Sequence, residues 1–584
     1  MKKLILPFIA LALIYSCGQE ATNEGGLRKL NGGKFAGGVL RMNEVEDFRN
    51  LYPLDITEVS SQRIANQIYE GLVKLSQKDL SIVPSISESW TKNDDATVWT
   101  FKIRKGVKFH NNECFQGGEG REVTAKDVKW CFDNLCTASP HNQWFEGTLK
   151  DRVKGANEYY QSTKDKKPLD GGVSGIKIID DNTVEIALNK PFAGFLNILV
   201  IPGCFIFPKE AVEKFGEDGM RTKAVGTGAF MIKAVKESEA VILERNPDYW
   251  AKDADGNQLP YLDAVRFSFI KEKKQELLEF KKGNLDMLYR IPTENIQDIL
   301  GDLDKAKENK PFDLQTSPAI SLFYYGFLHP VKPFNDKRVC LAFNHAIDRQ
   351  KIVDYTLKGE GIPATYGLVP PVPNFESKGY NFKGLKGYNF DPDMAKKLLA
   401  EAGYPNGKDF PHLTLQINSG GGDRNVLTAQ VVQGMLKENL NIDINIETLP
   451  FAQHLDKIES GHTLFWRSGW QSDYPDPEAF LTLLSSTHIP ANMSDRSFLN
   501  TTRFKNAKYD SLYEQANKEV DDKKRFELYM QADQVQLDEG ALMPIFYDEI
   551  YRLVQKNVKD FDVNAMEYRD VTRVYFVPEE EKKK

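Results

Sequence analysis

The sequence contains no apolar stretch long enough to cross a membrane. Its most apolar run, residues 4–15, would reach only about 18 Å as a helix, whereas the hydrocarbon core of a bilayer is roughly 30 Å thick. The run follows Lys2 and Lys3, and a short apolar segment behind a positively charged start is typical of a secretory signal. We therefore predict that residues 1–16 are a signal peptide and that the protein is exported.

Cysteine is also scarce, with six residues in 584. Cys17 follows Ile14, Tyr15 and Ser16. An aliphatic residue three positions before a cysteine, with a small residue directly before it, resembles the lipobox of bacterial lipoproteins. This resemblance implies that Cys17 is lipidated and becomes the mature N-terminus; the alternative is an ordinary signal peptide with an incidental Cys17. Residues 17–36 include a polar, glycine-rich stretch, so we expect them to form a flexible tether.

The remaining five cysteines are odd in number, so at least one is unpaired unless it bonds another chain. Export permits disulfides, but the spacing indicates no pairing and contains no CxxC motif. We expect each of these five cysteines to be a buried structural residue. These residues are Cys114, Cys131, Cys136, Cys204 and Cys340.

The sequence lacks the motifs of common catalytic and metal sites. Its eight histidines never occur in an HExxH pattern or another paired metal-ligand spacing, and no GxSxG nucleophile motif is present. The segment Ser419-Gly420-Gly421-Gly422 lacks the following Lys-Ser/Thr of a phosphate-binding loop. We therefore predict no catalytic residue, no metal and no cofactor, and expect His110, His329, His345 and His454 to be structural.

Neither sign of charge dominates the sequence. It has 76 basic and 83 acidic residues, and without the two signal-peptide lysines 74 minus 83 leaves a mature charge of −9. Lysine runs such as residues 271–274 are interleaved with acids and predict solvated helix faces. The chain therefore lacks the basic surface that nucleic-acid binding needs.

A chain of 584 residues is too long for one core and predicts two or three lobes. Alternating apolar residues predict strands, and apolar residues at i, i+3 and i+4 predict helices. Thr124 and Asp391 are expected helix N-caps, with Asp127 completing a capping box for the first. Because strands alternate with helices, we expect α/β lobes with mixed sheets. Strands are expected within 98–103, 176–188, 225–244, 413–418 and 442–449, and helices at 60–72, after 124, at 391–403 and at 428–439.

A candidate binding site lies at residues 465–477, where aromatic and charged residues are concentrated. Arg467 and Asp473 have the same parity, so an uninterrupted strand would direct both side chains to one face. Their Cα atoms would lie at most roughly 20 Å apart, and an arginine leaning along the strand would narrow that gap. An acid for the amine, a guanidinium for the carboxylate and indole walls would suit a zwitterion such as a tripeptide. Spacing alone leaves open that both charges face solvent or one another.

The order of several motifs resembles the extracellular solute-binding proteins of the oligopeptide, dipeptide and nickel class, which feed ABC importers. The resemblance covers essentially the whole mature chain, and the joint order of the motifs is more specific than any one of them. The matching segments are 68–73, 84–90, 99–110, 124–128, 226–230, 245–250, 337–349, 395–404, 469–477 and 543–545.

This resemblance implies an α/β, periplasmic-binding-protein-like fold with two lobes, mixed sheets, a hinge of two chain crossings and an additional third domain. Closure of the lobes would bury the ligand, and a peptide would bind as an added strand. The expected division is domain I at 37–77, 208–315 and 549–584, domain II at 78–207, and domain III, the ligand lobe, at 316–548.

The resemblance also implies roles for residues of the candidate site. Asp473 matches the acid that holds the α-ammonium of a peptide, and Arg467 matches the arginine that meets the carboxylate of short peptides. Trp470 matches a tryptophan that lines the pocket. The predicted ligand site comprises Asp473, Arg467, Trp470, Trp466, Gly469 and Tyr474.

We therefore predict a non-enzymatic, monomeric, lipid-anchored protein that faces the periplasm or the cell exterior. It would bind short peptides and deliver them to an ABC permease in the membrane. Two alternatives stay open. The same fold could bind an oligosaccharide, a metal chelate or haem, or the chain could be a peptide-sensing or chaperone-like lipoprotein without a permease.

Overall fold

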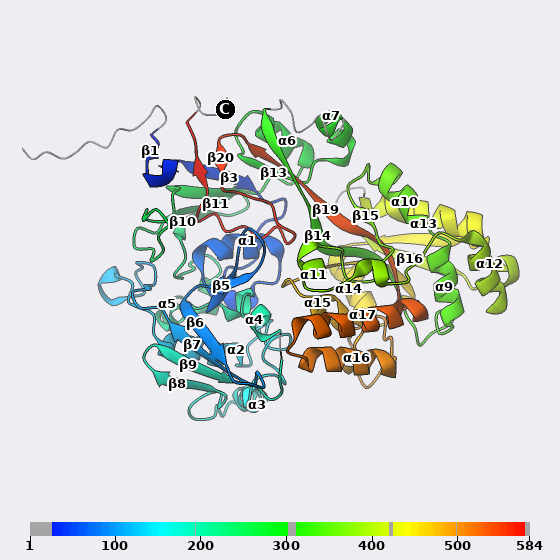
Figure 1. Cartoon of the computed structure of the whole chain (residues 1–584), viewed down its shortest axis with the longest axis horizontal. Helices are drawn as coiled ribbons and strands as arrows, with labels where there is room; N and C mark the ends of the chain where they lie inside the picture. Colours follow the sequence, from blue (N-terminus) through cyan, green and yellow to red (C-terminus); the bar gives the residue numbers. More distant parts are fainter. Residues whose placement is uncertain are drawn as a thin grey trace, which may run out of the picture.

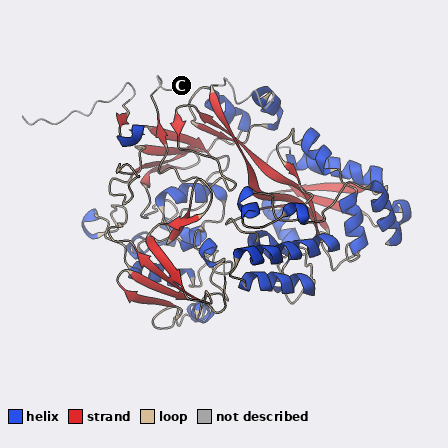
Figure 2. Ribbon diagram, in the orientation of Figure 1, coloured by secondary structure: helices blue, strands red, loops and turns tan. Residues whose placement is uncertain are grey.

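The computed structural model describes residues 26–192, 194–301, 311–419, 424–493, 495–497 and 499–578. The predicted signal peptide and Cys17 lie outside these residues. Within the described ranges, no helix combines the length and hydrophobicity that a membrane crossing requires. Helices and strands alternate along the chain (Figure 2), which confirms the α/β class.

Two four-stranded sheets form the N-terminal lobe, which we define as residues 26–315 and 549–578. The first sheet has the order β10-β11-β12-β3, with β12 parallel to β3 and the other neighbours antiparallel. The second has the order β6-β7-β9-β8 and is antiparallel. Their strands are β3 (Val39–Asn43), β6 (Ser87–Lys92), β7 (Val98–Ile103), β8 (Ile176–Asp180), β9 (Thr183–Ala187), β10 (Phe230–Lys236), β11 (Ala240–Arg245) and β12 (Ala264–Ser268).

One hydrophobic core joins these two sheets. It includes Leu40 of the first sheet and Phe101 of the second. Ile64 of α1 (Val59–Ile68) and Phe195 of α4 (Phe195–Ile198) are fully buried in the same core. The two sheets thus pack as one lobe.

A third, larger sheet runs from the N-terminal lobe into the C-terminal lobe, which we define as residues 316–548. Its order is β13-β19-β14-β18-β16-β17, with β15 paired to β19. It is mixed, because β16 is parallel to both β17 and β18 whereas β14 is antiparallel to its neighbours. The strands are β13 (Met287–Tyr289), β14 (Phe312–Phe327), β15 (Ile362–Pro363), β16 (Leu413–Asn418), β17 (Ile444–Leu449), β18 (Phe465–Gln471) and β19 (Leu542–Gln555).

The two longest strands connect the lobes. β14 has 16 residues and β19 has 14, and they pair side by side across the molecule (Figure 1). The sequence-based domain boundaries, 315/316 and 548/549, fall inside these strands. β14 and β19 are therefore the strands that pass from one lobe to the other.

The predicted helix starts are confirmed by their caps. Asp391 accepts a hydrogen bond from the backbone of Met394, and Thr124 forms a capping box with Asp127. The helix predicted at 60–72 ends earlier, at Ile68, because Glu70 forms an isolated β-bridge with Ile206. The other helices are α2 (Ala125–Leu135), α3 (Ala156–Lys164), α5 (Lys209–Gly219), α6 (Lys273–Lys281), α7 (Ile296–Leu300), α9 (Lys337–His345), α10 (Arg349–Lys351), α11 (Pro373–Ser377), α12 (Pro392–Glu401), α13 (Arg424–Leu440), α14 (Phe451–Glu459), α15 (Glu478–Leu481), α16 (Ala507–Lys518) and α17 (Asp522–Glu539).

The end of the expected tether belongs to the folded body instead. β1 (Arg28–Lys29) and β2 (Phe35–Ala36) pair as a short hairpin, and Phe35 is 2% exposed within the N-terminal core. Lys34 also forms an ion pair with Asp560, near the other end of the chain. Any flexible tether is thus shorter than residues 17–36, because a buried phenylalanine fixes the end of that segment.

Candidate functional site

The candidate site is built on β18, whose pairing places its odd-numbered residues on one face. In the register with β14, Tyr325 lies opposite Arg467 and Phe323 lies opposite Gly469. The strand is uninterrupted from Phe465 to Gln471, and Asp473 follows two residues later. The predicted strand and its parity are confirmed up to the point where the chain turns.

Arg467 is a half-buried cation that forms no direct ion pair among the described residues, although the negative charge of Asp548 opposes the lowering of its pKa. Its Nη1 donates to Oδ1 of Asn418 at 3.1 Å, and its guanidinium lies 4.6 Å from the ring centroid of Phe323. Its Nε has no hydrogen-bond partner. Desolvation lowers the pKa of Arg467 to about 10, so the side chain stays charged at neutral pH and retains unused donors for an anion.

Asp473 is the complementary charge. No hydrogen bond or ion pair joins its carboxylate to another described group, and desolvation alone raises its pKa to about 6. The residue is nevertheless exposed to solvent. An accessible yet desolvated carboxylate is expected where a side chain faces a narrow, water-filled space between protein walls.

The arginine leans along the strand toward this acid. A Cβ built on Gly469 would lie 3.2 Å from Nη2 of Arg467, so the guanidinium lies beside a residue two positions closer to Asp473. The remaining four residues span at most about 13 Å. An extended dipeptide or tripeptide is about 7–10 Å long, and a hydrogen bond at each end adds about 3 Å. The span therefore matches a dipeptide, at about 13 Å in all, whereas a tripeptide, at about 16 Å, requires the Asp473 carboxylate to lie beyond its Cα.

The aromatic residues predicted for the site divide into two groups. Trp470 is half-buried against the C-terminal core, and its Nε1 lacks a partner. Trp466 instead is 0% exposed and packs with Leu328 and Ile458. Both tryptophans have even numbers, so burial and not parity separates them: Trp466 is enclosed in the core, whereas part of Trp470 stays exposed.

Tyr474 also has a different environment from the one expected of a ligand contact. Its hydroxyl donates to Glu478 in the same turn, and its ring packs against the core of the N-terminal lobe. Tyr474 thus joins the lobes, whereas Asp473, Arg467, Trp470 and Gly469 remain candidate ligand contacts.

Other polar residues near Arg467 were not predicted from the sequence. Arg424 and Arg290 form ion pairs with Asp548 at 2.7 and 3.3 Å. Although burial would raise it, these two arginines hold the pKa of Asp548 well below its usual range. Their charges come from α13, from the chain after β13 and from β19, so only long-range folding brings them together. A sequence signal existed only for Asn418, the last residue of the predicted strand at 413–418.

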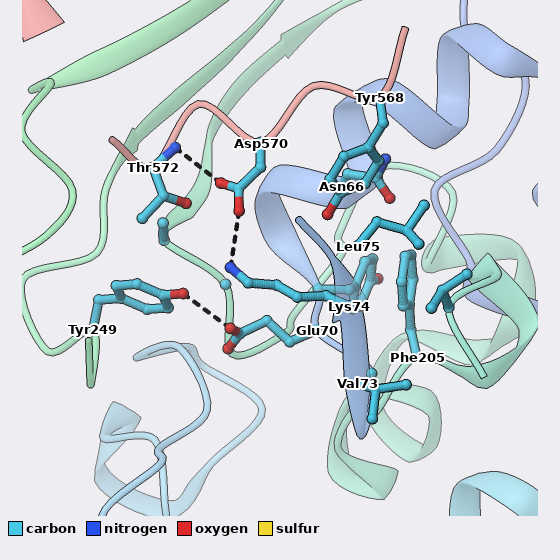
Figure 3. Close-up of a pocket in the computed structure, with 15 residues that line it drawn as sticks. Asn66, Glu70, Val73, Lys74, Leu75, Phe205, Tyr249, Tyr568, Asp570 and Thr572 are labelled. Carbon is cyan, nitrogen blue, oxygen red and sulfur yellow. Dashed lines mark hydrogen bonds and ion pairs between the residues drawn. The ribbon is translucent and has the colours of Figure 1, made fainter. Parts of the chain in front are cut away.

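Three segments that carry the family resemblance meet at Glu70, a buried carboxylate that is 6% exposed (Figure 3). Glu70 accepts hydrogen bonds from Tyr249 at 2.9 Å, from Trp250 Nε1 at 3.0 Å and from Thr227 at 3.0 Å. The glycine on each side of Thr227 is required, because a Cβ at Gly226 would lie 2.2 Å from the backbone oxygen of Ile68. These motifs therefore build the fold.

The cavity beside Glu70 is too small for a solute. Its volume is about 20 Å³, which is room for about one water molecule. Lys74 and Asp570, which line it, are paired at 2.8 Å (Figure 3). This cavity is therefore a structural feature, distinct from the residues on β18.

The histidines singled out from the sequence bond to backbone oxygens. His110 lies 2.9 Å from the oxygen of Gly228, His329 2.8 Å from that of Ala541, and His454 2.9 Å from that of Arg467. Among the described residues, no group of three His, Cys, Asp or Glu side chains is placed to hold a metal. The five described cysteines are free thiols, and all except the half-buried Cys114 are buried.

Comparison with known proteins agrees with this architecture. The family model for bacterial extracellular solute-binding proteins, family 5, matches residues 81–491. The periplasmic oligopeptide-binding protein of Salmonella typhimurium is 30% identical over 527 residues, which are 88% of each chain. The heme-binding protein A of Haemophilus influenzae is 26% identical over 513 residues, which are 87% of this chain and 86% of that protein.

A solved structure shares the fold. The periplasmic binding protein DppA of Helicobacter pylori, in complex with the peptide STSA, has a TM-score of 0.75 at 24% identity. The match covers 93% of this chain and 98% of that one. Family membership does not by itself fix the solute, since these relatives are named for different ligands. The chain belongs to the bacterial extracellular solute-binding proteins of family 5.

Proposed function

We propose that this protein binds short peptides with free termini and delivers them to an ABC permease. The observation that supports the proposal is that Arg467, on β18, and Asp473, two residues beyond its end, carry opposite charges and form no direct ion pair with a described residue. Asp473 would accept the α-ammonium, and Arg467 would donate to the carboxylate. A desolvated charge is unfavourable until it meets its counter-charge, so a zwitterion of matching length satisfies both groups at once.

The rest of the site suits a ligand that varies in its side chains. Gly469 leaves room beside the strand for a peptide backbone, and Trp470 offers part of a half-buried indole. Large aromatic surfaces bind many apolar side chains without demanding one shape. Main-chain hydrogen bonds would then supply affinity that is independent of peptide sequence.

The location follows from the N-terminal sequence. We propose that a lipid on Cys17 holds the monomeric protein at a membrane surface, facing the periplasm or the cell exterior. The hairpin at Arg28–Ala36 fixes where such a tether would leave the N-terminal lobe. No step of this function involves turnover of the solute.

Isothermal calorimetry with trialanine, N-acetyl-trialanine and trialanine amide tests the proposal. The free tripeptide should bind most tightly, the acetylated one should lose the Asp473 contact, and the amide should lose the Arg467 contact. Heat should also appear with other peptides of two to six residues. If none of these peptides binds while haem or an oligosaccharide does, the peptide assignment is wrong.

A further inference from the structure

The turn that follows Asp473 carries a second acid, and its own lobe holds this acid rigidly. Asp476 lies between Pro475 and Pro477 and is 1% exposed. Nη1 of Arg525, on α17, donates to its Oδ2 at 2.6 Å. The backbone N–H of Glu478 donates to its Oδ1 at 3.0 Å. The charge of Asp476 is therefore compensated inside the C-terminal lobe.

A residue of the other lobe also reaches this carboxylate. Nδ2 of Asn197 donates to Oδ2 of Asp476 at 3.2 Å. Asn197 belongs to α4, which Phe195 and Ile198 anchor in the core of the N-terminal lobe. Figure 1 shows α4 beside the helices α15 and α17 at the boundary of the lobes. The hydrogen bond thus joins two groups that are each fixed to a different lobe.

The surroundings of this bond also join the lobes. Tyr474 packs against the N-terminal core, and Val200, three residues after Asn197, packs against the C-terminal core. Burial raises the pKa of Tyr474 well above its usual value, and the positive charge of Arg152 from the N-terminal lobe opposes that shift. The bond therefore lies within a continuous contact between the two lobes.

We propose that Asn197 is a positioning residue that latches the N-terminal lobe onto the turn that captures the amino end of the ligand. This proposal rests on the proposed function. Asp473 and Asp476 share one short turn braced by two prolines, so binding of an ammonium at Asp473 and closure at Asp476 act on the same segment. The latch keeps the ligand in place without touching it.

The chemistry of the pair suits a reversible latch. Because Arg525 already neutralises Asp476, opening the lobes leaves no unpaired charge behind and returns only a neutral carboxamide to water. A hydrogen bond to a carboxylate is stronger than one between neutral groups. The bond can therefore slow opening while remaining weak enough to break when the solute is handed over.

Stopped-flow tryptophan fluorescence with trialanine tests the latch through Asn197→Ala and Asn197→Asp. We expect Asn197→Ala to raise the dissociation rate about tenfold and leave the association rate nearly unchanged. Asn197→Asp should have a larger effect, because it places two carboxylates face to face. The control is Asn189→Ala, whose side chain bonds only to backbone oxygens of its own lobe, and it should match the wild type.

Two further readouts separate latching from folding and from function. Unliganded Asn197→Ala should still unfold cooperatively, with only the small decrease in melting temperature that the loss of one hydrogen bond causes, and the rate increase should be the same for trialanine and trialanine amide. A wild-type dissociation rate in both Asn197 variants would overturn the latch. If the wild-type protein binds no peptide at all, the proposed function fails. An unchanged radius of gyration in unliganded Asn197→Asp by X-ray scattering would then overturn the latch separately.

Discussion

Replacement of Asp473 by Asn removes the negative charge and keeps the size of the side chain. No described residue pairs with this carboxylate, so the change breaks no contact in the unliganded protein, whereas a bound ammonium loses its partner. Truncating one member of a desolvated charge pair costs about 2–5 kcal/mol. Because Asp473 is reached by solvent, we expect the lower end of this range, a loss of about thirtyfold in affinity.

The same residue should make binding depend on pH. Desolvation raises the pKa of Asp473 to about 6, so about nine in ten molecules are ionised at pH 7 and about one in ten at pH 5. Over this range a peptide keeps its ammonium and its carboxylate charged, and desolvation lowers the pKa of the nearby His454 to about 4. Affinity for trialanine should therefore fall about tenfold from pH 7 to pH 5 in the wild type. It should stay nearly constant in Asp473→Asn.

Calorimetry at pH 5, 6 and 7 measures both effects. Asp443→Asn is a suitable control, because that side chain is 79% exposed and pairs only with Lys437. The pKa of Asp473 in the folded protein lies above its usual value of 3.8, so the folded state binds more protons than the unfolded state between about pH 4 and pH 6. The free energy of unfolding of the unliganded wild type should therefore fall as the pH rises through this range, and that of the Asn variant should not. Wild-type affinity in Asp473→Asn, or an equal pH dependence in both proteins, would refute the assignment.

Further changes test the other parts of the proposal. Arg467→Ala should weaken trialanine by at least about tenfold and trialanine amide much less; equal losses in calorimetry would exclude a carboxylate contact. Gly469→Ala should lower the affinity for free-carboxylate peptides about threefold, because its Cβ would lie 3.2 Å from Nη2 of Arg467. An unchanged affinity would mean that the guanidinium can move aside without loss of ligand binding. Glu70→Ala should lower the free energy of unfolding, measured by chemical denaturation, by roughly 3 kcal/mol or more, because several buried donors lose their acceptor. The folded variant should still bind trialanine. Loss of binding with unchanged stability would contradict the structural role of Glu70. Cys17→Ala should release the protein into the soluble fraction on cell fractionation, and continued membrane association would require another anchor.

The secondary structure was predictable wherever local chemistry decides it. The strands at 98–103 and 413–418 match β7 and β16 residue for residue, because alternation and flanking turns mark both ends. The N-cap at Asp391 was also predictable from the sequence. The early end of α1 was not, because it depends on pairing between Glu70 and Ile206, which are distant in sequence. The buried hairpin at 28–36 was not predicted for the same reason. A glycine-rich composition does not reveal that a phenylalanine within it packs on a core formed by residues distant in sequence.

The two charged residues of the candidate site could be chosen from the sequence, whereas the residues that contact them could not. The strand that carries Arg467 was predictable, whereas the burial of Trp466 depends on Leu328 and Ile458, which are distant in sequence. Concentration of aromatic residues was therefore a weaker guide than strand geometry. Phe323 and Asn418 hold the guanidinium of Arg467 in place without neutralising its charge. Both lie on other strands, so one sequence could not show that they contact Arg467.

Recognition of the family and recognition of the ligand rest on different residues. Most of the motif set lies in the N-terminal lobe, and three of its segments converge on Glu70, where every contact is internal. Those motifs report the fold and would be the same for a binder of another solute. The choice of solute depends on whether the carboxylate of Asp473 and the guanidinium of Arg467 are both free. Since a desolvated charge without an ion-pair partner is unfavourable in the empty protein, two such charges of opposite sign within the length of a short peptide argue for a ligand that carries both counter-charges.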